Sequence, residues 1–189
     1  MDPTKLLEAD HRIVESLFEQ IENAEGEERS ALIQELVTSV RSHMELEEQV
    51  VYPAMEPVTG AEPVQEGVTE HELARKALAD MIALAPDQPG FGAAFEAVKA
   101  GIEHHVEEEE GEVFPQLRKE GQEALTAMAT PFMAKRLELG LPMDAEAIAD
   151  ASTKEELLEE ARLAEVDGAA SMTKTQLAQA LSEKMTGSA

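Results

Sequence analysis

The feature that most constrains this chain is a segment that occurs twice, at residues 43–53 and again at 105–115. Each copy begins with His, has Glu four and five residues later, and ends with an aromatic residue followed by Pro. On a helix, positions i and i+4 lie one above the other. His43 with Glu47, and His105 with Glu109, therefore each direct a nitrogen and a carboxylate to one place. Two such helices facing each other predict a metal site.

The second copy has two candidate registers, because His104 and Glu108 are also four residues apart. Pro53 follows His43 by ten residues, and the residue ten before Pro115 is His105. The apolar face of this helix also passes through His105 and not through His104. We therefore expect His104 at a boundary position or beside the ligands. The glutamates that flank the two pairs are expected on a solvated outer face: Glu45, Glu48, Glu107, Glu108 and Glu110.

Each copy is preceded by a helix that carries one inward His, His11 or His71, directly after an acidic residue. A single His on an apolar face is usually an ordinary core residue. Four of them beside two inner-face glutamates are a different case, since a buried ionised Glu costs several kcal/mol unless it is paired or bound to metal. No Lys or Arg occupies these faces near Glu47 or Glu109, so the pattern favours metal binding.

Composition and periodicity predict an all-α protein. Aromatic residues make up only 3% of the chain, while Ala, Leu, Glu and Met are abundant. Four long helices joined by short loops predict an up-down-up-down four-helix bundle. Thr4 is expected as the first N-cap, and Pro53 and Pro57, then Gly60 and Pro63, are expected to end the second helix and supply the connection. An additional helix at 121–139 is expected to pack across the bundle. The four bundle helices are expected at about 4–23, 28–52, 63–84 and 91–117.

The charge and the missing cysteines exclude several function classes. A net charge of −25 disfavours nucleic acid and anionic membranes as partners, because affinity for both comes from Lys and Arg. The absence of Cys leaves His and carboxylate as metal ligands. No apolar run approaches the ~20 residues that span a bilayer, and the N-terminus lacks a leader pattern, so we expect a cytoplasmic protein.

Tyr52 is the only Tyr of the chain, and the second copy has Phe114 at its place. One interpretation is an aromatic residue that packs at the end of the helix. The other is that its hydroxyl faces the metals, as a hydrogen-bond donor or as a phenolate ligand. Wheel arithmetic does not decide between them, because Pro53 disturbs the helix there.

With these residues the chain resembles the hemerythrin-like HHE cation-binding family over about residues 4–139. The resemblance implies a non-heme di-iron centre, bridged by oxo or hydroxo, with manganese or zinc as alternatives. It also implies that Glu47 and Glu109 bridge or cap the irons. Oxygen-carrying hemerythrins have a fifth matching His, so reversible oxygen transport is disfavoured here. The implied nitrogen ligands are His11, His43, His71 and His105.

The resemblance leads to two hypotheses of different class. In one, the protein is an enzyme of the oxidative or nitrosative stress response that decomposes hydrogen peroxide, as a catalase does. In the other, it senses O2 or NO, or stores iron, without turnover. A Tyr52 ligand would favour the enzyme, because a tyrosinate stabilises the ferric state. An appended tail would favour the sensor.

The division expected along the chain is a bundle with its following helix at 1–140, a linker at 141–151 and a small helical tail at 152–189. The tail resembles the helix-loop-helix of Rho N-terminal-like and SAP-type modules. Those modules often bind nucleic acid, but this tail is acidic. A stabilising role or a protein partner is therefore the better expectation.

Overall fold

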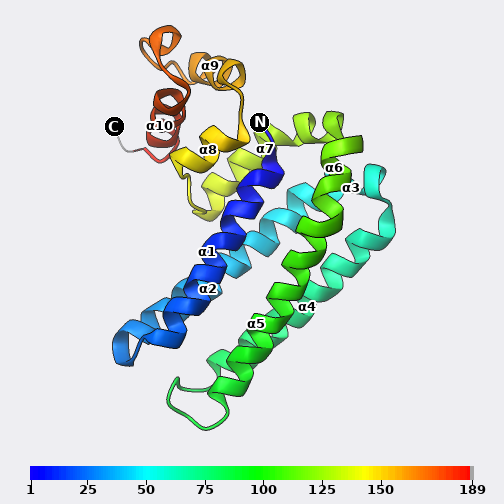
Figure 1. The fold of residues 1–189 in the computed structure, drawn as a ribbon, viewed down its shortest axis with the longest axis vertical. Coiled ribbons are helices and arrows are strands. Elements are labelled where there is room, and N and C mark those ends of the chain that lie inside the picture. Colours follow the sequence, from blue (N-terminus) through cyan, green and yellow to red (C-terminus); the bar gives the residue numbers. More distant parts are fainter. Residues whose placement is uncertain (188–189) are drawn as a thin grey trace.

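The computed structural model describes residues 1–187, and all regular structure in that part is helical. Four long helices run up and down beside one another as an antiparallel bundle (Figure 1). The expected fold class is confirmed. In the described residues, no helix is long and apolar enough to cross a membrane. The bundle helices are α1 (Pro3–Asn23), α2 (Gly26–Leu46), α4 (Ala61–Ile82) and α5 (Phe91–Glu108).

The first helix begins two residues earlier than its expected cap. The side chain of Asp2 accepts a hydrogen bond from the backbone N–H of Thr4, and Pro3 occupies the first helical position. The expectation that Thr4 caps this helix is therefore wrong. Pro is well suited to the first position because its missing N–H has no helical partner there.

The two helices that carry the His-Glu pairs each continue past a proline, Pro53 or Pro115. In both, a single π-helical turn comes shortly before the proline. These turns are η1 (Glu47–Val51) and η2 (Glu109–Val113), and they lead into α3 (Tyr52–Thr59) and α6 (Phe114–Glu120). In a regular α-helix a proline ring collides with the carbonyl four residues back, and the wider turn accommodates it. The expected end of the second helix at residue 51 or 52 is wrong, since Pro53 and Pro57 lie inside the continued helix. It stops at Gly60, one of the residues expected to end it, whose φ is +90°.

Two apolar clusters fill the bundle on either side of its middle. The cluster nearer the α1–α2 and α4–α5 loops is built around Phe18, Leu36 and Phe95. The other contains Leu46, Phe114 and residues of α7 (Gln122–Leu139), which packs against α1, α2, α3 and α6. The expected extra helix is present, with Met128, Phe132 and Met133 buried and Leu137 exposed.

The tail forms a small group of helices next to the N-terminus (Figure 1). Residues 141–151, expected as a linker, contain α8 (Ala145–Ala151), which packs on α1 and α10. α9 (Lys154–Leu163) begins with a capping box of Thr153 and Glu156, and α10 (Lys174–Met185) has the same box with Thr173. Residues 188–189 of the expected tail lie outside the described part.

Candidate metal centre

The four inward histidines meet as two pairs at the middle of the bundle. The Nε2 atoms of His11 and His43 lie 3.1 Å apart, and those of His71 and His105 lie 3.2 Å apart. Each pair joins one helix hairpin, α1 with α2 or α4 with α5. All four rings are more than nine-tenths buried. The spacing of the sequence repeat thus becomes two facing sets of nitrogen donors.

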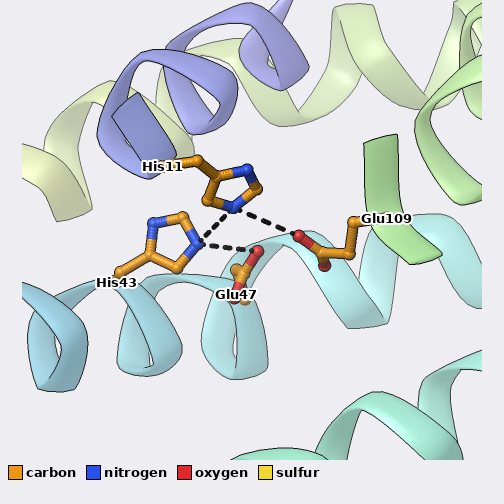
Figure 2. A group of neighbouring side chains, drawn as sticks. All are labelled: His11, His43, Glu47 and Glu109. Atoms are coloured by element: carbon orange, nitrogen blue, oxygen red, sulfur yellow. Dashed lines mark hydrogen bonds and ion pairs between the residues drawn. The ribbon is translucent and has the colours of Figure 1, made fainter. Parts of the chain in front are cut away.

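The two glutamates lie between the pairs. Glu47 has Oε1 3.3 Å from His43 Nε2 and Oε2 3.2 Å from His71 Nε2, so its two oxygens are divided between the pairs. Glu109 Oε2 lies 3.5 Å from His11 Nε2 and 3.6 Å from His105 Nε2. Figure 2 shows both carboxylates directed toward the His11–His43 pair. All six residues predicted as metal ligands therefore come together in one buried cluster.

A carboxylate faces the Nδ1 atom of every one of these rings. Glu110, Glu48 and Glu70 lie 2.8, 2.9 and 2.8 Å from Nδ1 of His11, His71 and His105. A carboxylate only accepts, so the ring nitrogen facing it carries a proton, and Nε2 is the nitrogen that can bind metal once any proton on it is released. The expectation of solvated outer positions for Glu48 and Glu110 is wrong, since both are partly buried against histidines.

His43 is oriented in a different way, through a buried arginine on α7. Its Nδ1 lies 3.5 Å from Asp10 Oδ2. Arg136 donates to both oxygens of Asp10, at 2.5 and 2.9 Å, and also to the carbonyl of Pro142. The guanidinium is 2% exposed. This bidentate pair connects the segment after α7 to a candidate ligand.

The electrostatics of the cluster are dominated by burial and by these carboxylates. Burial lowers the pKa of His43, but Glu47 and Asp10 outweigh it and raise the pKa to about 10. Burial also opposes charge on His105, whose pKa Glu109 and Glu47 raise to about 11. Burial alone would raise the pKa of Glu47, yet the surrounding histidines hold it well below its usual range. The centre therefore attracts positive charge.

Tyr52 and Phe114 occupy equivalent places but do different things. Tyr52 Oη lies 3.1 Å from His71 Nε2, while the Phe114 ring stacks on His11 with centroids 6.0 Å apart. Burial, together with the charges of Glu47 and the other carboxylates, raises the pKa of Tyr52 far above its usual value, so the phenol keeps its proton. Its hydroxyl fits against Gly67, where a Cβ would lie 2.5 Å from Oη.

Two cavities reach the cluster from different directions. One, of about 120 Å³, is lined by Tyr52, His105 and Glu109 at its inner end and by several glutamates farther out. The other, of about 30 Å³, is enclosed mainly by apolar side chains such as Val14, Val40 and Ile102. A polar approach and a small apolar space thus meet at the same histidines.

The residues fit a pair of cations. Both oxygens of Glu47 and Oε2 of Glu109 are buried without a hydrogen-bond partner, an arrangement that costs several kcal/mol unless positive charge compensates it. His11, His43, Glu47 and Glu109 can converge on one ion, and Glu47, His71 and His105 on another. Nitrogen and oxygen donors without sulfur suit iron, manganese or zinc. The fold and the cluster define the class: a helix-bundle protein with a buried His/Glu cluster suited to binding cations.

Comparison with known proteins places the chain within that class. The family model for the hemerythrin HHE cation binding domain matches residues 2–117. The chain belongs to this family, and metal binding is what the family and the His/Glu cluster together indicate.

Among solved structures, a hemerythrin HHE cation binding domain-containing protein from Mycobacterium kansasii has a similar fold, with a TM-score of 0.60 and 21% sequence identity. The match covers 96% of this chain and 99% of that one. No match was found among curated proteins. The comparisons give no support to the expected likeness of the tail to Rho N-terminal-like and SAP-type modules.

Sequence reasoning missed the residues that hold the ligands in place. Glu48 and Glu110 directly follow Glu47 and Glu109, and this repeated Glu-Glu pair was the available signal. The acid before each lone His was a second signal, because Asp10 and Glu70 contact the other His of their own hairpin. Arg136 had no signal in the sequence at all.

Proposed function

We propose that the protein is a non-heme di-iron protein that reacts with hydrogen peroxide, O2 or NO. The observation that carries the proposal is the pairing of four buried Nε2 atoms around two carboxylates, one of which divides its oxygens between the pairs. His11, His43, Glu47 and Glu109 would hold one ion, and Glu47, His71 and His105 the other.

Tyr52 supports the enzyme over a passive store. The second group has fewer donors than the first, and Tyr52 Oη lies beside it, 3.1 Å from His71 Nε2. We propose that this oxygen completes the group around the second ion. In the metal-free chain the phenol keeps its proton at the inner end of the larger cavity, so binding of the oxygen to the ion as phenolate would release that proton.

The proposed reaction is the conversion of two hydrogen peroxide molecules into two water molecules and O2. The iron pair, when bound, would supply the redox couple that one peroxide reduces and the next reoxidises. The chain would contribute a route by which peroxide enters and apolar walls that exclude water. The cavity of about 120 Å³ admits a neutral polar molecule, and the apolar walls on the other side limit water.

The first test is iron content and oxygen release. The anaerobic metal-free protein is titrated with Fe2+, and an end point near two ions per chain is expected. The loaded protein is then given peroxide in an oxygen electrode, against the same concentration of free iron. Sustained release over many turnovers supports the enzyme. Preferred binding of Mn2+ or Zn2+, with little Fe2+ taken up, would contradict the di-iron proposal.

Tyr52→Phe separates the two interpretations of this residue. Loss of a visible charge-transfer band in the ferric protein would identify the phenolate as a ligand, whereas an unchanged band would eliminate it. Glu107→Gln, an exposed change on the same helix as His105, serves as the control.

A second candidate function is binding without turnover, as an O2 or NO sensor or an iron store. The small apolar cavity favours it, because its volume of about 30 Å³ suits a diatomic molecule. So does the connection from Pro142 through Arg136 and Asp10 to His43, which joins the segment between α7 and the tail to the centre. Oxygen release no faster than that of free iron would select this candidate.

For the tail we propose a stabilising role or a protein partner. Its helix α8 packs on α1, and Lys5 contacts the carbonyl and the carboxylate of Asp150. The N-terminal ammonium pairs with Glu156. We place the protein in the cytoplasm, where reducing conditions keep Fe2+ available for loading.

A further inference from the structure

The larger cavity has an acidic entrance that belongs to the second repeat alone. Its inner end is formed by Tyr52, His105 and Glu109, all buried. Toward the surface it is lined by four glutamates from α4, α5 and η2, two of them exposed and two partly buried. These four residues, named here the acidic mouth, are Glu66, Glu70, Glu108 and Glu112.

The corresponding positions of the first repeat are closed. When His11 is aligned with His71 and His43 with His105, the counterparts of Glu66, Glu108 and Glu112 are Leu6, Leu46 and Val50. Leu6 and Leu46 are at most 2% exposed. They belong to the apolar cluster that α7 completes. The acids therefore lie on the side of the bundle formed by α4 and α5, whereas α7 packs against α1, α2, α3 and α6.

At the inner end of the cavity, Glu109 is 4% exposed and is one of the lining residues. Its Oε2 has no hydrogen-bond partner and makes only the longer contacts, at 3.5 and 3.6 Å, with His11 and His105. Water or a neutral ligand would satisfy a carboxylate only partly. A cation is what such an oxygen attracts most strongly. The cavity thus connects acidic surface residues to a candidate metal ligand.

A third group of metal-type donors lies at the rim. His104 Nε2 is 3.6 Å from Glu70 Oε1 and 3.3 Å from Glu108 Oε1, and one atom from each residue lies within 4.8 Å of the others. His104 is 63% exposed. The same Glu70 reaches inward with Oε2, 2.8 Å from His105 Nδ1. The rim group and the buried centre therefore share a direct contact.

We propose that the acidic mouth is the loading port of the metal centre, and that Glu70, His104 and Glu108 form a transient capture site for a divalent transition-metal cation. The proposal rests on the proposed metal centre. An exposed site with three protein donors holds a cation weakly and exchanges it with solvent. The surrounding charge raises the local cation concentration, and the unpartnered Glu109 oxygen gives the ion its next partner inward.

The test measures loading rates on the full metal-free chain, with Co2+ as probe and its visible absorption followed after rapid mixing. The port variant carries Glu66→Gln, Glu108→Gln and Glu112→Gln. The matched control carries Glu62→Gln, Glu103→Gln and Glu107→Gln, exposed positions of the same helices that do not line the cavity. Both variants change the net charge equally.

We expect the port variant to load Co2+ about 10-fold more slowly than the control at low ionic strength, since steering by local charge is worth about 10- to 1,000-fold in rate. The difference should shrink with added salt. Removal by a chelator should slow equally, with final metal content and spectrum unchanged. Equal loading rates for the two variants would overturn the port while leaving the metal centre intact. No uptake by the unmodified chain would overturn both.

His104→Ala tests the capture site separately, because it changes ligation while leaving the carboxylates in place. Loading that is severalfold slower and stays slower at high salt supports capture at the rim. A rate equal to that of the unmodified protein at all salt concentrations would contradict it.

Discussion

The two repeats present the same ligands but treat their outer faces in opposite ways. In the first repeat, Asp10 behind His43 is sealed by Arg136 of α7. In the second, Glu70 behind His105 faces the exposed His104 instead. α7 packs against α1, α2, α3 and α6, whereas the side of the bundle formed by α4 and α5 keeps a cavity. The repeated His-Glu motif thus forms a nearly symmetric cluster. The packing of α7 on one side of it determines on which side the cavity remains.

The aromatic positions follow the same division. Tyr52 directs a hydroxyl to His71, and Gly67 of α4 leaves room for it. The equivalent positions are Phe114 and Leu7, both fully buried in the apolar cluster below α7. The polar aromatic residue therefore lies on the side that carries the cavity, and the apolar one lies on the closed side.

The largest effect is expected when the residue types at one pair of equivalent positions, 46 and 108, are exchanged. Leu46→Glu places an unpaired carboxylate at a fully buried site and removes an apolar side chain, so we expect a loss of about 5 kcal/mol or more in the free energy of unfolding. Glu108→Leu at the partly exposed counterpart should change it by about 0.5 kcal/mol or less. Urea unfolding followed by circular dichroism measures both. Similar losses at the two positions would refute the division into a closed and an open face.

Arg136→Met tests how much the buried ion pair between Arg136 and Asp10 contributes to stability. Removing one partner of a buried ion pair costs about 3–5 kcal/mol, because the other charge stays buried and unpaired. His104→Ala beside Glu70 should cost about 0.5 kcal/mol or less, since that contact is exposed. The free energy of unfolding in urea gives both values. Asp10→Asn added to Arg136→Met should restore part of the loss; no recovery would mean that Arg136 acts through contacts other than Asp10.

Glu47→Gln tests the element that joins the two halves. Residues that only orient metal ligands contribute about 10- to 100-fold in metal affinity, and Glu47 faces both histidine pairs. We therefore expect more than about a 100-fold loss in affinity, measured by competition with a chelator. Glu107→Gln, which removes an exposed carboxylate, should bind metal normally. A Glu47→Gln protein that retains two tightly bound ions would exclude a bridging role.

Gly67→Ala has the smallest expected effect and tests the Tyr52 side alone. A Cβ there would lie 2.5 Å from Tyr52 Oη and 2.9 Å from its Cζ. Crowding of this kind costs about 1–3 kcal/mol, and it would also move the hydroxyl from His71. The matched control is Gly101→Ala, whose Cβ meets nothing within 4 Å and should stabilise α5 by up to about 1 kcal/mol. Thermal unfolding compares the two, and equal stability would show that Gly67 is not required for Tyr52.

The ligand cluster could be predicted closely from the sequence, because helix geometry converts i, i+4 spacing into a shared face regardless of context. His43 with Glu47, and His105 with Glu109, needed nothing else. The same arithmetic failed after the first pair, where the second helix was expected to end at residue 51 or 52 but continues past Pro53 after a π turn. The fourth helix was expected to continue past Pro115 and does so, but its π turn was not foreseen. The spacing of residues along the sequence predicts a regular α-helix and does not indicate where a π turn occurs.

The sequence alone was enough to predict the all-α class and the six His and Glu residues that meet in the buried cluster, because spacing within a helix fixes which residues share a face. Which side of that cluster is covered depends on the packing of helices that are far apart in the chain. Arg136 contacts Asp10 across 126 positions of the chain, and Tyr52 reaches Gly67 on another helix. Such contacts depend on how α7 and α4 pack against the bundle, and no local pattern encodes that packing.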